Sequence, residues 1–376
     1  MNFPPKVSIV GTGHCGCAMA AELAQRGGMS LLYASPKHSR HLDAIREKGV
    51  LRAEMKVSGT SKPELTTDLI QAVKFSNYLV VTVPSYGHDD ILDRLQKFDL
   101  HDHTIIFING NFIAVKARKL LNARAVLETN ASPFASRMED GIVAVSGIKS
   151  AVPIAALPKI YDPEVLASIA SIFPGELQWC ENILEIGMQS NNGVIHPPAT
   201  LLNTGWIETT HGDFYFYRDG MSPSVSNIIE MLDKERLMIA AAFGFTVKTV
   251  LEEMVDFYGV TFENFTEFAS QSKPHNVLRV APNSMTSRFV IEDIPFILVP
   301  WYELGLKAGI EAKTIKLMID LASIINGVDY QSDGRSLKNL GLEDMSKSEI
   351  LEFCSSRAAI SSSQLQLTQH FEPMNT

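Results

Sequence analysis

The chain has 376 residues, more than the roughly 250 to 300 at which a single hydrophobic core stops growing, so we expect two domains. Hydrophobic residues make up 45% and charged residues 20%, a composition that excludes an intrinsically disordered protein. With 42 acidic against 33 basic residues and no basic run, the chain lacks the surface that a nucleic-acid partner needs.

The N-terminus and the apolar segments indicate a cytoplasmic protein. The start, MNFPPKVSIV, has no charged region followed by a cleavable apolar stretch. The longest central apolar run, Leu237–Val247, is shorter than the about 20 residues of a membrane span, so we expect no membrane partner. The cysteines fit neither a disulfide framework nor a paired zinc pattern, so no metal site is expected. They are Cys15, Cys17, Cys180 and Cys354.

A glycine-rich turn follows the first predicted strand, Lys6–Val10. It reads GTGHCG and leads into a helical pattern rich in alanine. In a strand-turn-helix unit, Gly11 permits the tight turn, Gly13 lets a diphosphate approach the backbone, and Gly16 lets helix and strand pack closely. The free N–H groups of the helix then face the phosphates. We predict that Gly11, Gly13, His14 and Gly16 bind a dinucleotide.

The second predicted strand, Met29–Tyr33, ends without the acid that NAD-preferring sites carry about 20 residues after the glycines. Ser35, Lys37 and Arg40 follow it instead, and a hydroxyl with two cations suits the 2′-phosphate of NADP(H). We therefore predict that these three residues bind NADP(H) in preference to NAD(H). The alternative is a solvated basic helix start.

Three further β-branched runs end in small polar residues and predict a parallel sheet with helices on both faces, an α/β fold. They are Tyr78–Val83, Thr104–Ile108 and Ala125–Glu128. Ligands bind such sheets at the carboxyl ends of the strands, so the residues there are candidates for the cofactor or the substrate, or else plain turn residues. They are Pro84, Ser85, Asn109, Thr129 and Asn130. Three later runs are expected to extend the sheet: Ile142–Val145, Val152–Leu157 and Leu177–Trp179.

Longer helical patterns replace the strand pattern from about Ile186. We predict an N-terminal Rossmann-type dinucleotide-binding domain over residues 1–185, an all-α C-terminal domain over 186–357, and a tail over 358–376. No Gly/Ser linker separates the two domains, so we expect a cleft between them. The clearest helices are Ser224–Phe243, Val247–Tyr258, Pro295–Ala308 and Thr314–Ile325.

The segment SNNGVIHPPATLLNTGWIE is predicted to be the first helix of the second domain, entering the cleft. Pro197 and Pro198 should kink it and present His196 at the bend. Asn191, Gly193 and His196 are then expected to face the nicotinamide end of the cofactor. The spacing alone leaves open whether the histidine is catalytic or only structural.

Several motifs of this chain resemble the octopine/nopaline (opine) dehydrogenase family. They are NNGVIHPPATLLNTGWIE, KPHNV at Lys273–Val277, RFVIEDIPFILVPWYELGLKAGI at Arg288–Ile310, and GRSLKNLGLEDMS at Gly334–Ser346. The segments ETNASPFASR, FPGELQW and MLDKERLMIAAAFGF are similar to the opine synthases of plant-associated bacteria. Together with the glycine turn, the resemblance covers nearly the whole chain.

The resemblance implies a reaction in which an amino acid condenses with an α-keto acid and NAD(P)H reduces the imine. It implies that His196 is catalytic, that Asp293 is its acidic partner, and that Arg288 binds a substrate carboxylate. The alternative for Arg288 and Asp293 is a surface ion pair at a helix start. Further substrate-binding candidates are Thr129, for the keto acid, and Asn192 and Trp206. Trp301 is a candidate for the amino-acid pocket, with a core position as the alternative for both tryptophans.

Two other interpretations stay open at this point. A ketopantoate or glycerol-3-phosphate type reductase would share the architecture, but those enzymes use a lysine at the start of the helical domain, and this chain has no lysine between Ile160 and Asp233. A non-enzymatic NADP(H) sensor would keep the glycine turn without needing His196, Arg288 and Asp293 together. The family includes monomers and dimers, and we expect a homodimer.

Overall fold

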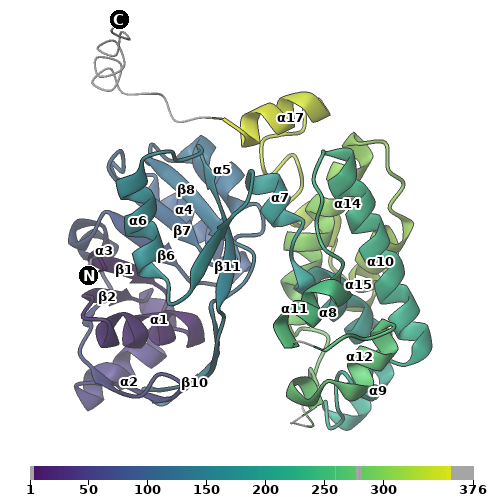
Figure 1. Cartoon of the computed structure of the whole chain (residues 1–376), viewed down its shortest axis with the longest axis horizontal. Coiled ribbons are helices and arrows are strands. Elements are labelled where there is room, and N and C mark those ends of the chain that lie inside the picture. Colours follow the sequence, from purple (N-terminus) through teal and green to yellow (C-terminus); the bar gives the residue numbers. More distant parts are fainter. Residues whose placement is uncertain (1–3, 259, 277–278, 280, 357–376) are drawn as a thin grey trace, which may run out of the picture.

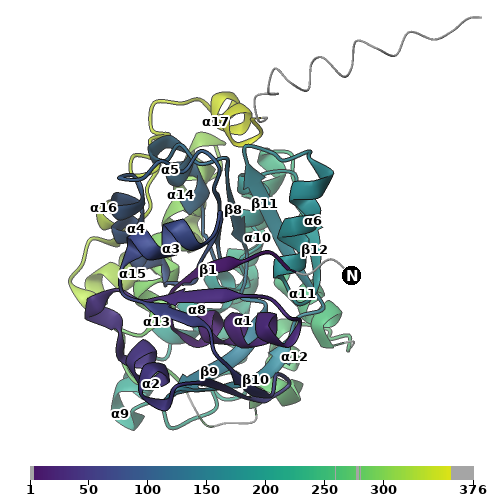
Figure 2. The ribbon, with the colours of Figure 1, turned by 90° about the vertical axis from the view of Figure 1, so that its left-hand side faces the viewer.

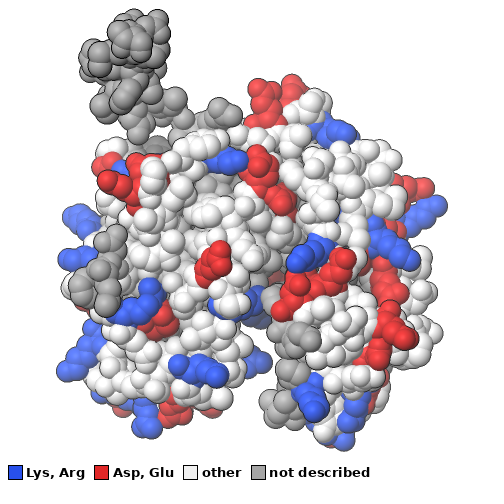
Figure 3. Space-filling model, viewed as in Figure 1, with Lys and Arg blue, Asp and Glu red and all other residues white. Residues whose placement is uncertain are grey.

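The computed structural model describes residues 4–258, 260–276, 279 and 281–356. A lobe built around a sheet is followed by a helical lobe, and the surface is hollowed between the two (Figures 1 and 3). Val277 of the KPHNV segment, Arg357 and the predicted tail over 358–376 lie outside the described residues. Among the helices that are described, none is both long enough and apolar enough to cross a bilayer.

An eight-stranded sheet, counted over the described residues, forms the centre of the first lobe in the order β12-β11-β8-β7-β6-β1-β2-β5. From β5 to β8 the strands are parallel, as predicted. β11 is antiparallel to β8 and parallel to β12, so the last two strands run the other way. The bounds are β1 (Val7–Val10), β2 (Ser30–Tyr33), β5 (Glu64–Thr66), β6 (Tyr78–Val81), β7 (Thr104–Phe107), β8 (Ala125–Thr129), β11 (Ala151–Leu157) and β12 (Glu176–Trp179).

The central strands are buried on both faces, which explains why they read as continuous apolar runs. Ile9 packs in the core on the side of α1, whereas its neighbour Val10 packs with α3, α4 and α5 on the other side. The helices of this lobe are α1 (His14–Gln25), α2 (Arg40–Lys48), α3 (Leu69–Phe75), α4 (His88–Leu95), α5 (Ile113–Leu120) and α6 (Pro163–Ile172), with short 3-10 turns η1 (Pro36–His38) and η2 (Ser85–Gly87).

A separate four-stranded sheet, in the order β4-β3-β10-β9, corrects one prediction. The run at Ile142–Val145 belongs to β10 of this small sheet and does not extend the main one. Its hydrophobic pattern could not reveal this, because β10 pairs with β3 about ninety residues earlier in the chain. The small sheet covers α1 on the side away from the main sheet (Figure 2). Its strands are β3 (Leu51–Met55), β4 (Gly59–Ser61), β9 (Phe134–Glu139) and β10 (Ile142–Ile148).

The second lobe is helical, as predicted, and the boundary expected between residues 185 and 186 falls inside α7. The predicted helix over Pro295–Ala308 begins with a π-helical turn, η4, that leads directly into α14. At the end of the described chain, α17 packs on α7, and Asn182 donates to the Ser355 hydroxyl (2.9 Å). The elements are α7 (Ile183–Gly187), α8 (Asn191–Leu201), α9 (Thr204–Thr210), α10 (Pro223–Ala242), α11 (Val250–Tyr258), α12 (Phe265–Gln271), η3 (Lys273–Asn276), α13 (Arg288–Ile291), η4 (Ile294–Leu298), α14 (Val299–Lys307), α15 (Lys313–Asn326), α16 (Tyr330–Asp333) and α17 (Lys347–Cys354).

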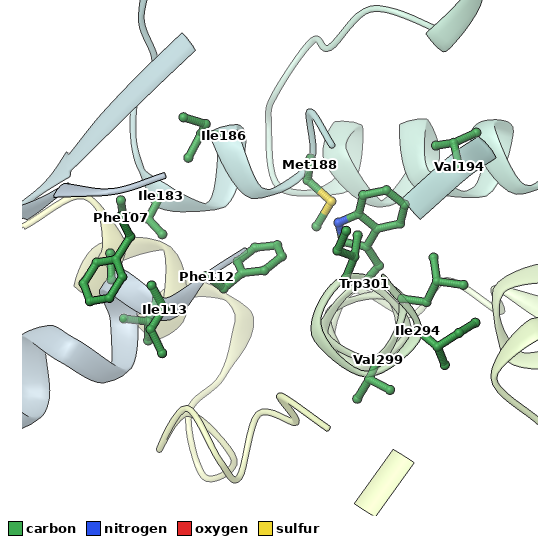
Figure 4. Close-up of a cluster of buried hydrophobic side chains, with 14 of the residues drawn as sticks. Phe107, Phe112, Ile113, Ile183, Ile186, Met188, Val194, Ile294, Val299 and Trp301 are labelled. Atoms are coloured by element: carbon green, nitrogen blue, oxygen red, sulfur yellow. The ribbon is translucent and has the colours of Figure 1, made fainter. Parts of the chain in front are cut away.

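Phe112, just before α5, joins the interiors of the two lobes. Its ring lies between the sheet side, with Phe107, and the helical side, with Met188 and Trp301 (Figure 4). A Cβ atom added at Gly187 would lie 2.2 Å from this ring, so the glycine is needed for the close approach. One hydrophobic core therefore continues from the first lobe into the second.

Arg335, after α16, connects the loop that follows β7 to the helical lobe through hydrogen bonds. The side chain is 1% exposed, and its Nη1 donates to the carbonyl oxygens of Gly110 (2.7 Å) and Asn111 (2.6 Å). Burial lowers its pKa to about 10, so the guanidinium stays charged at neutral pH. The loop that follows β7 is thus held from the second lobe.

Glu128, in β8, caps the start of α5 and makes stability depend on pH. Its carboxylate accepts from the backbone N–H groups of Phe112 (3.0 Å) and Ala114 (3.2 Å), and burial raises its pKa to about 7. Because this pKa lies above the ordinary 4.5, the folded state holds the proton more tightly than the unfolded chain does. This contribution to stability is therefore lost as the pH rises from about 4.5 to about 7.

We expect the Glu128→Gln variant to lack this loss. Between pH 4.5 and pH 8, its free energy of unfolding should rise relative to wild type by up to about 3 kcal/mol, at about 1.4 kcal/mol for each pKa unit. Denaturant unfolding at both pH values measures the change. Glutamine has one carboxamide oxygen where glutamate has two carboxylate oxygens, and the hydrogen bond lost in this way changes the free energy of unfolding by the same amount at both pH values. A difference that does not change with pH would contradict the assignment.

Candidate active site

The glycine turn leaves open space at the start of α1. Gly11 has φ +124°, and a Cβ there would lie 2.6 Å from the Thr82 hydroxyl oxygen. A Cβ at Gly16 would lie 2.0 Å from the Gly11 carbonyl oxygen, whereas one at Gly13 would meet nothing within 4 Å. No side chain caps α1, so its first N–H groups face this space. The arrangement fits a dinucleotide whose diphosphate lies against Gly13.

Two cavities meet at this turn and share Gly13, Thr82, Val83, Pro84 and Tyr86. The β2-side cavity, about 780 Å³, continues along the end of β2 and η1 to α4. The β9-side cavity, about 610 Å³, continues to the loop behind β7, to β9 and to the helical lobe. Together they provide an elongated site with the glycine turn at its middle.

The basic residues predicted to follow β2 separate into two groups. Ser35 and Lys37 line the β2-side cavity. Arg40 does not line it and lies 3.8 Å from Asp140, with 80% of its side chain exposed. Arg94 lines the cavity from α4 and went unpredicted, although Asp90, Ile91 and Arg94 share one helix face at i, i+1 and i+4 spacing.

His196 and Asp293 form a hydrogen-bonded pair, although 97 residues separate them in the chain. Nδ1 of His196 lies 2.7 Å from Oδ2 of Asp293, whose side chain is 6% exposed. Phe289 stacks on the imidazole with ring centres 3.7 Å apart. Burial raises the pKa of Asp293, and the hydrogen bond from His196 opposes that rise. Asp293 thus holds Nδ1, which leaves Nε2 to exchange a proton.

Arg288 and Glu292 connect this pair to the first lobe. Nε of Arg288 donates to Glu292 (2.7 Å), and Glu292 also accepts from the backbone N–H of Ser85 (2.8 Å). Both side chains line the β9-side cavity, and Glu292 directly precedes Asp293. The alternative of a surface ion pair between Arg288 and Asp293 is not formed, because Arg288, with 56% of its side chain exposed at the start of α13, pairs with the buried Glu292 instead. Glu292 was not predicted, because the sequence IED does not tell which acid faces the histidine.

The other predicted contributors to the substrate site lie in varied surroundings. Thr129 is buried, and its hydroxyl donates to the carbonyl of Ala131 (2.9 Å) and accepts from the N–H of Asn109 (3.3 Å). Asn192 lies four residues before His196 in α8 and so on the same face. Trp206 is 41% exposed and stacks on Phe214.

Two residues of the helix that carries His196 do not face the cofactor cavities as predicted. A Cβ at Gly193 would meet Ile297 and Trp301, so Gly193 faces the interior of the helical lobe, whereas Asn191 donates to Glu253, which lines a third cavity away from the glycine turn. Trp301 is a core residue with no exposure, whose Nε1 donates to the Gly187 carbonyl (2.9 Å). α8 continues through Pro197 and Pro198 as one helix, with both prolines inside it.

Comparison with known proteins gives two family matches. Residues 179–326 match the NAD/NADP octopine/nopaline dehydrogenase alpha-helical domain, and residues 7–159 match ketopantoate reductase PanE/ApbA. The opine dehydrogenase of Arthrobacter sp. (strain 1C) is 31% identical over 353 residues, which cover 91% of this chain and 97% of that enzyme. The chain belongs to the opine dehydrogenase family.

Solved structures agree with this chain in fold. Octopine dehydrogenase, solved with NADH and L-arginine, superposes with a TM-score of 0.70 at 17% identity, over 99% of this chain and 100% of that one. Yersinopine dehydrogenase with bound NADP+ superposes with a TM-score of 0.69 at 15% sequence identity, over 94% of this chain and 99% of that one. The expected order of a Rossmann-type domain and a helical domain is confirmed.

As a member of this family, the protein is an oxidoreductase that acts on CH–NH groups and uses a nicotinamide dinucleotide. The ketopantoate reductase model matches only the nucleotide-binding half of the chain, whereas the helical half matches the octopine/nopaline dehydrogenase model. A ketopantoate-type reductase and a non-enzymatic sensor are both disfavoured.

A further histidine near the His196–Asp293 pair was not predicted as a site residue. His275 lies in the KPHNV segment, and its Nδ1 is 2.7 Å from the Ser272 hydroxyl. Burial, and then the charge of His196, lower its pKa to about 4, so it is neutral at physiological pH. Its place within a family motif was the signal that could have identified it.

Proposed function

We propose that this enzyme condenses the amine of an amino acid with an α-keto acid and reduces the resulting imine to an N-(carboxyalkyl) amino acid, with NADPH preferred over NADH. The observation that carries the proposal is the His196–Asp293 pair, joined through Glu292 and Arg288 to a cavity that begins at the glycine turn. One proton source, one carboxylate-binding cation and a dinucleotide site are the parts that this reaction needs.

Each residue of the pair has a distinct role in the proposed reaction. When bound, the reduced nicotinamide supplies the hydride. His196 exchanges a proton with the substrate through Nε2, because Asp293 holds Nδ1. The carboxylate of Asp293 fixes the ring orientation and stabilises the protonated imidazole. Phe289, stacked on the ring, keeps water from that face.

Arg288 is proposed to bind a substrate carboxylate. Its Nε donates to Glu292 (2.7 Å), so Glu292 holds the guanidinium at the wall of the β9-side cavity and leaves the two terminal nitrogens as a fork for a ligand. Both an amino acid and an α-keto acid carry a carboxylate that suits this fork. Glu292 positions Arg288 and also accepts a hydrogen bond from the backbone N–H of Ser85, after β6.

A matrix of amino acids and α-keto acids, with NADPH oxidation followed by absorbance, tests the function. We expect turnover only when an amino acid and a keto acid are present together. Keto acids alone serve as the control, because a ketopantoate-type reductase would reduce them directly to hydroxy acids. Turnover with a keto acid alone, or none with any pair, would refute the proposal.

The preference for NADPH is proposed to rest on Lys37. Ser35 and Lys37 line the β2-side cavity, where no acid ends β2. We expect Lys37→Ala to weaken NADPH binding by about tenfold and to leave NADH binding unchanged, because a charge-assisted contact to the 2′-phosphate is lost. Nicotinamide fluorescence measures both affinities. Arg40→Ala is the matched control, since Arg40 points to Asp140. Equal losses for both cofactors would remove this role from Lys37.

A further inference from the structure

His14 lies where the two cavities meet. It is the first residue of α1 and lines the β9-side cavity, and its Nδ1 accepts from the backbone N–H of Met138 in β9 (2.7 Å). Its pKa is lowered by burial first, and then by the positive charges of Arg137 and His41. His14 is thus a neutral ring with its proton on Nε2, flanked by one basic side chain from the small sheet and another from α2.

His41 has a buried ring nitrogen that no described residue satisfies. It lies in the first turn of α2 and lines the β2-side cavity, and its Nδ1 is buried without a hydrogen-bond partner in the described part of the chain. The charged groups around it are Arg40 and Asp140, and the neutral ring of His14 lies nearby. This nitrogen has almost no accessible surface, but the His41 ring lines the cavity. Because a buried polar atom without a partner is costly, the ring would gain from a ligand there that offers it a hydrogen bond.

Arg137 lines the β9-side cavity from the small sheet. Among the arginines that line the two cavities, Arg94 has Asp90 as its ion-pair partner and Arg288 has Glu292. Arg137 pairs with no carboxylate among the described residues and is exposed toward solvent. It is therefore a guanidinium with all its donors available for an anion.

We propose that His41 and Arg137 clamp the diphosphate of the dinucleotide from outside the glycine motif. A dinucleotide that fills both cavities must cross their shared residue Gly13, and its diphosphate is the group that joins the two nucleotides. His41 lines the β2-side cavity and Arg137 lines the β9-side cavity. Gly13, which the two cavities share, is also the N-cap residue of α1, whose start has no side-chain cap. The small sheet then serves binding, because β9 brings Arg137 and the N–H of Met138 to the turn.

The test measures cofactor affinity without substrates. In Arg137→Met, we expect the dissociation constants of NADPH and NADH to rise by the same factor, about tenfold or more, because the diphosphate is common to both. His41→Phe should weaken both cofactors equally by a smaller factor. Arg52→Met is the matched control, since Arg52 lies on β3 of the same sheet, pairs with Glu54 and lines neither cavity. Nicotinamide fluorescence gives the affinities, and thermal unfolding confirms that the exposed substitution leaves the fold intact.

Two results would overturn the clamp. Unchanged affinities with a raised KM for the keto acid would assign Arg137 to a substrate carboxylate, and a loss confined to NADPH would assign it to the 2′-phosphate. The inference rests on the dinucleotide site and not on the proposed substrates. If no amino acid and keto acid pair is turned over while Arg137→Met still weakens both cofactors, the proposed function fails and the clamp stands.

Discussion

Replacing His196 with alanine is expected to lower kcat by at least about a hundredfold while the affinity for NADPH stays unchanged. The imidazole is the group we propose to exchange a proton with the reacting nitrogen, and general acid catalysis contributes about 10² to 10⁴ in rate. Its ring lies in the helical lobe against Phe289 and Asp293 and lines neither cavity at the glycine turn. Removing it therefore spares the cofactor site.

The measurement is steady-state NADPH oxidation with the best substrate pair, together with fluorescence titration of the cofactor. His101→Ala is the matched control, because His101 is an exposed histidine of the first lobe that pairs only with acids at the surface. A decrease in kcat below tenfold, or an equal loss of NADPH affinity, would remove the catalytic role from His196.

Replacing Asp293 with asparagine is expected to lower kcat by about a hundredfold or more, with the fold retained. An asparagine can still hydrogen-bond to Nδ1, but it lacks the charge that stabilises a protonated ring and can select the wrong tautomer. In a histidine–aspartate pair of another enzyme, the same change costs about 10⁴ in kcat. Because burial raises the pKa of Asp293, its charge is not what stabilises the fold.

Turnover and thermal unfolding together test this second variant. We expect the activity to fall with little change in the unfolding temperature, whereas Asp320→Asn, at an exposed ion pair with Lys316, should change neither. If Asp293→Asn kept wild-type turnover, the carboxylate would be only a structural partner of the histidine. If it unfolded the protein, the carboxylate would be needed for the fold.

The sequence predicts those parts of the molecule whose chemistry is local. The glycine turn was recognisable because a strand, three spaced glycines and a helix follow one another within twenty residues, and its steric needs are met by Gly11 and Gly16. The pairing of His196 with Asp293 was predicted from family motifs. Spacing alone could not join His196 to Asp293 across 97 residues, and the structure places them in hydrogen-bond contact.

Side-chain direction was the part that the sequence could not predict. Asn191 and Gly193 lie within five residues of His196, but the face each presents depends on Glu253, Ile297 and Trp301, which come from distant segments. Arg40 shows the same limit, because a basic residue beside a phosphate site and one paired with a neighbouring acid have the same local pattern. β10 looked like any other strand until its partner β3 was known.

The ring of Phe112, wedged between the two lobes, bears on how substrates enter. Separating the lobes would expose the interior they share, at about 25 cal/mol for each Å² of apolar surface, and would also break the bonds from Arg335 to the loop behind β7. A wide hinge motion between the lobes therefore costs much free energy. We expect substrates to enter and products to leave through small movements of residues at the rim of the cleft. The residues that we propose to be catalytic are then largely in position before any ligand binds, so little of the binding free energy is needed to assemble them.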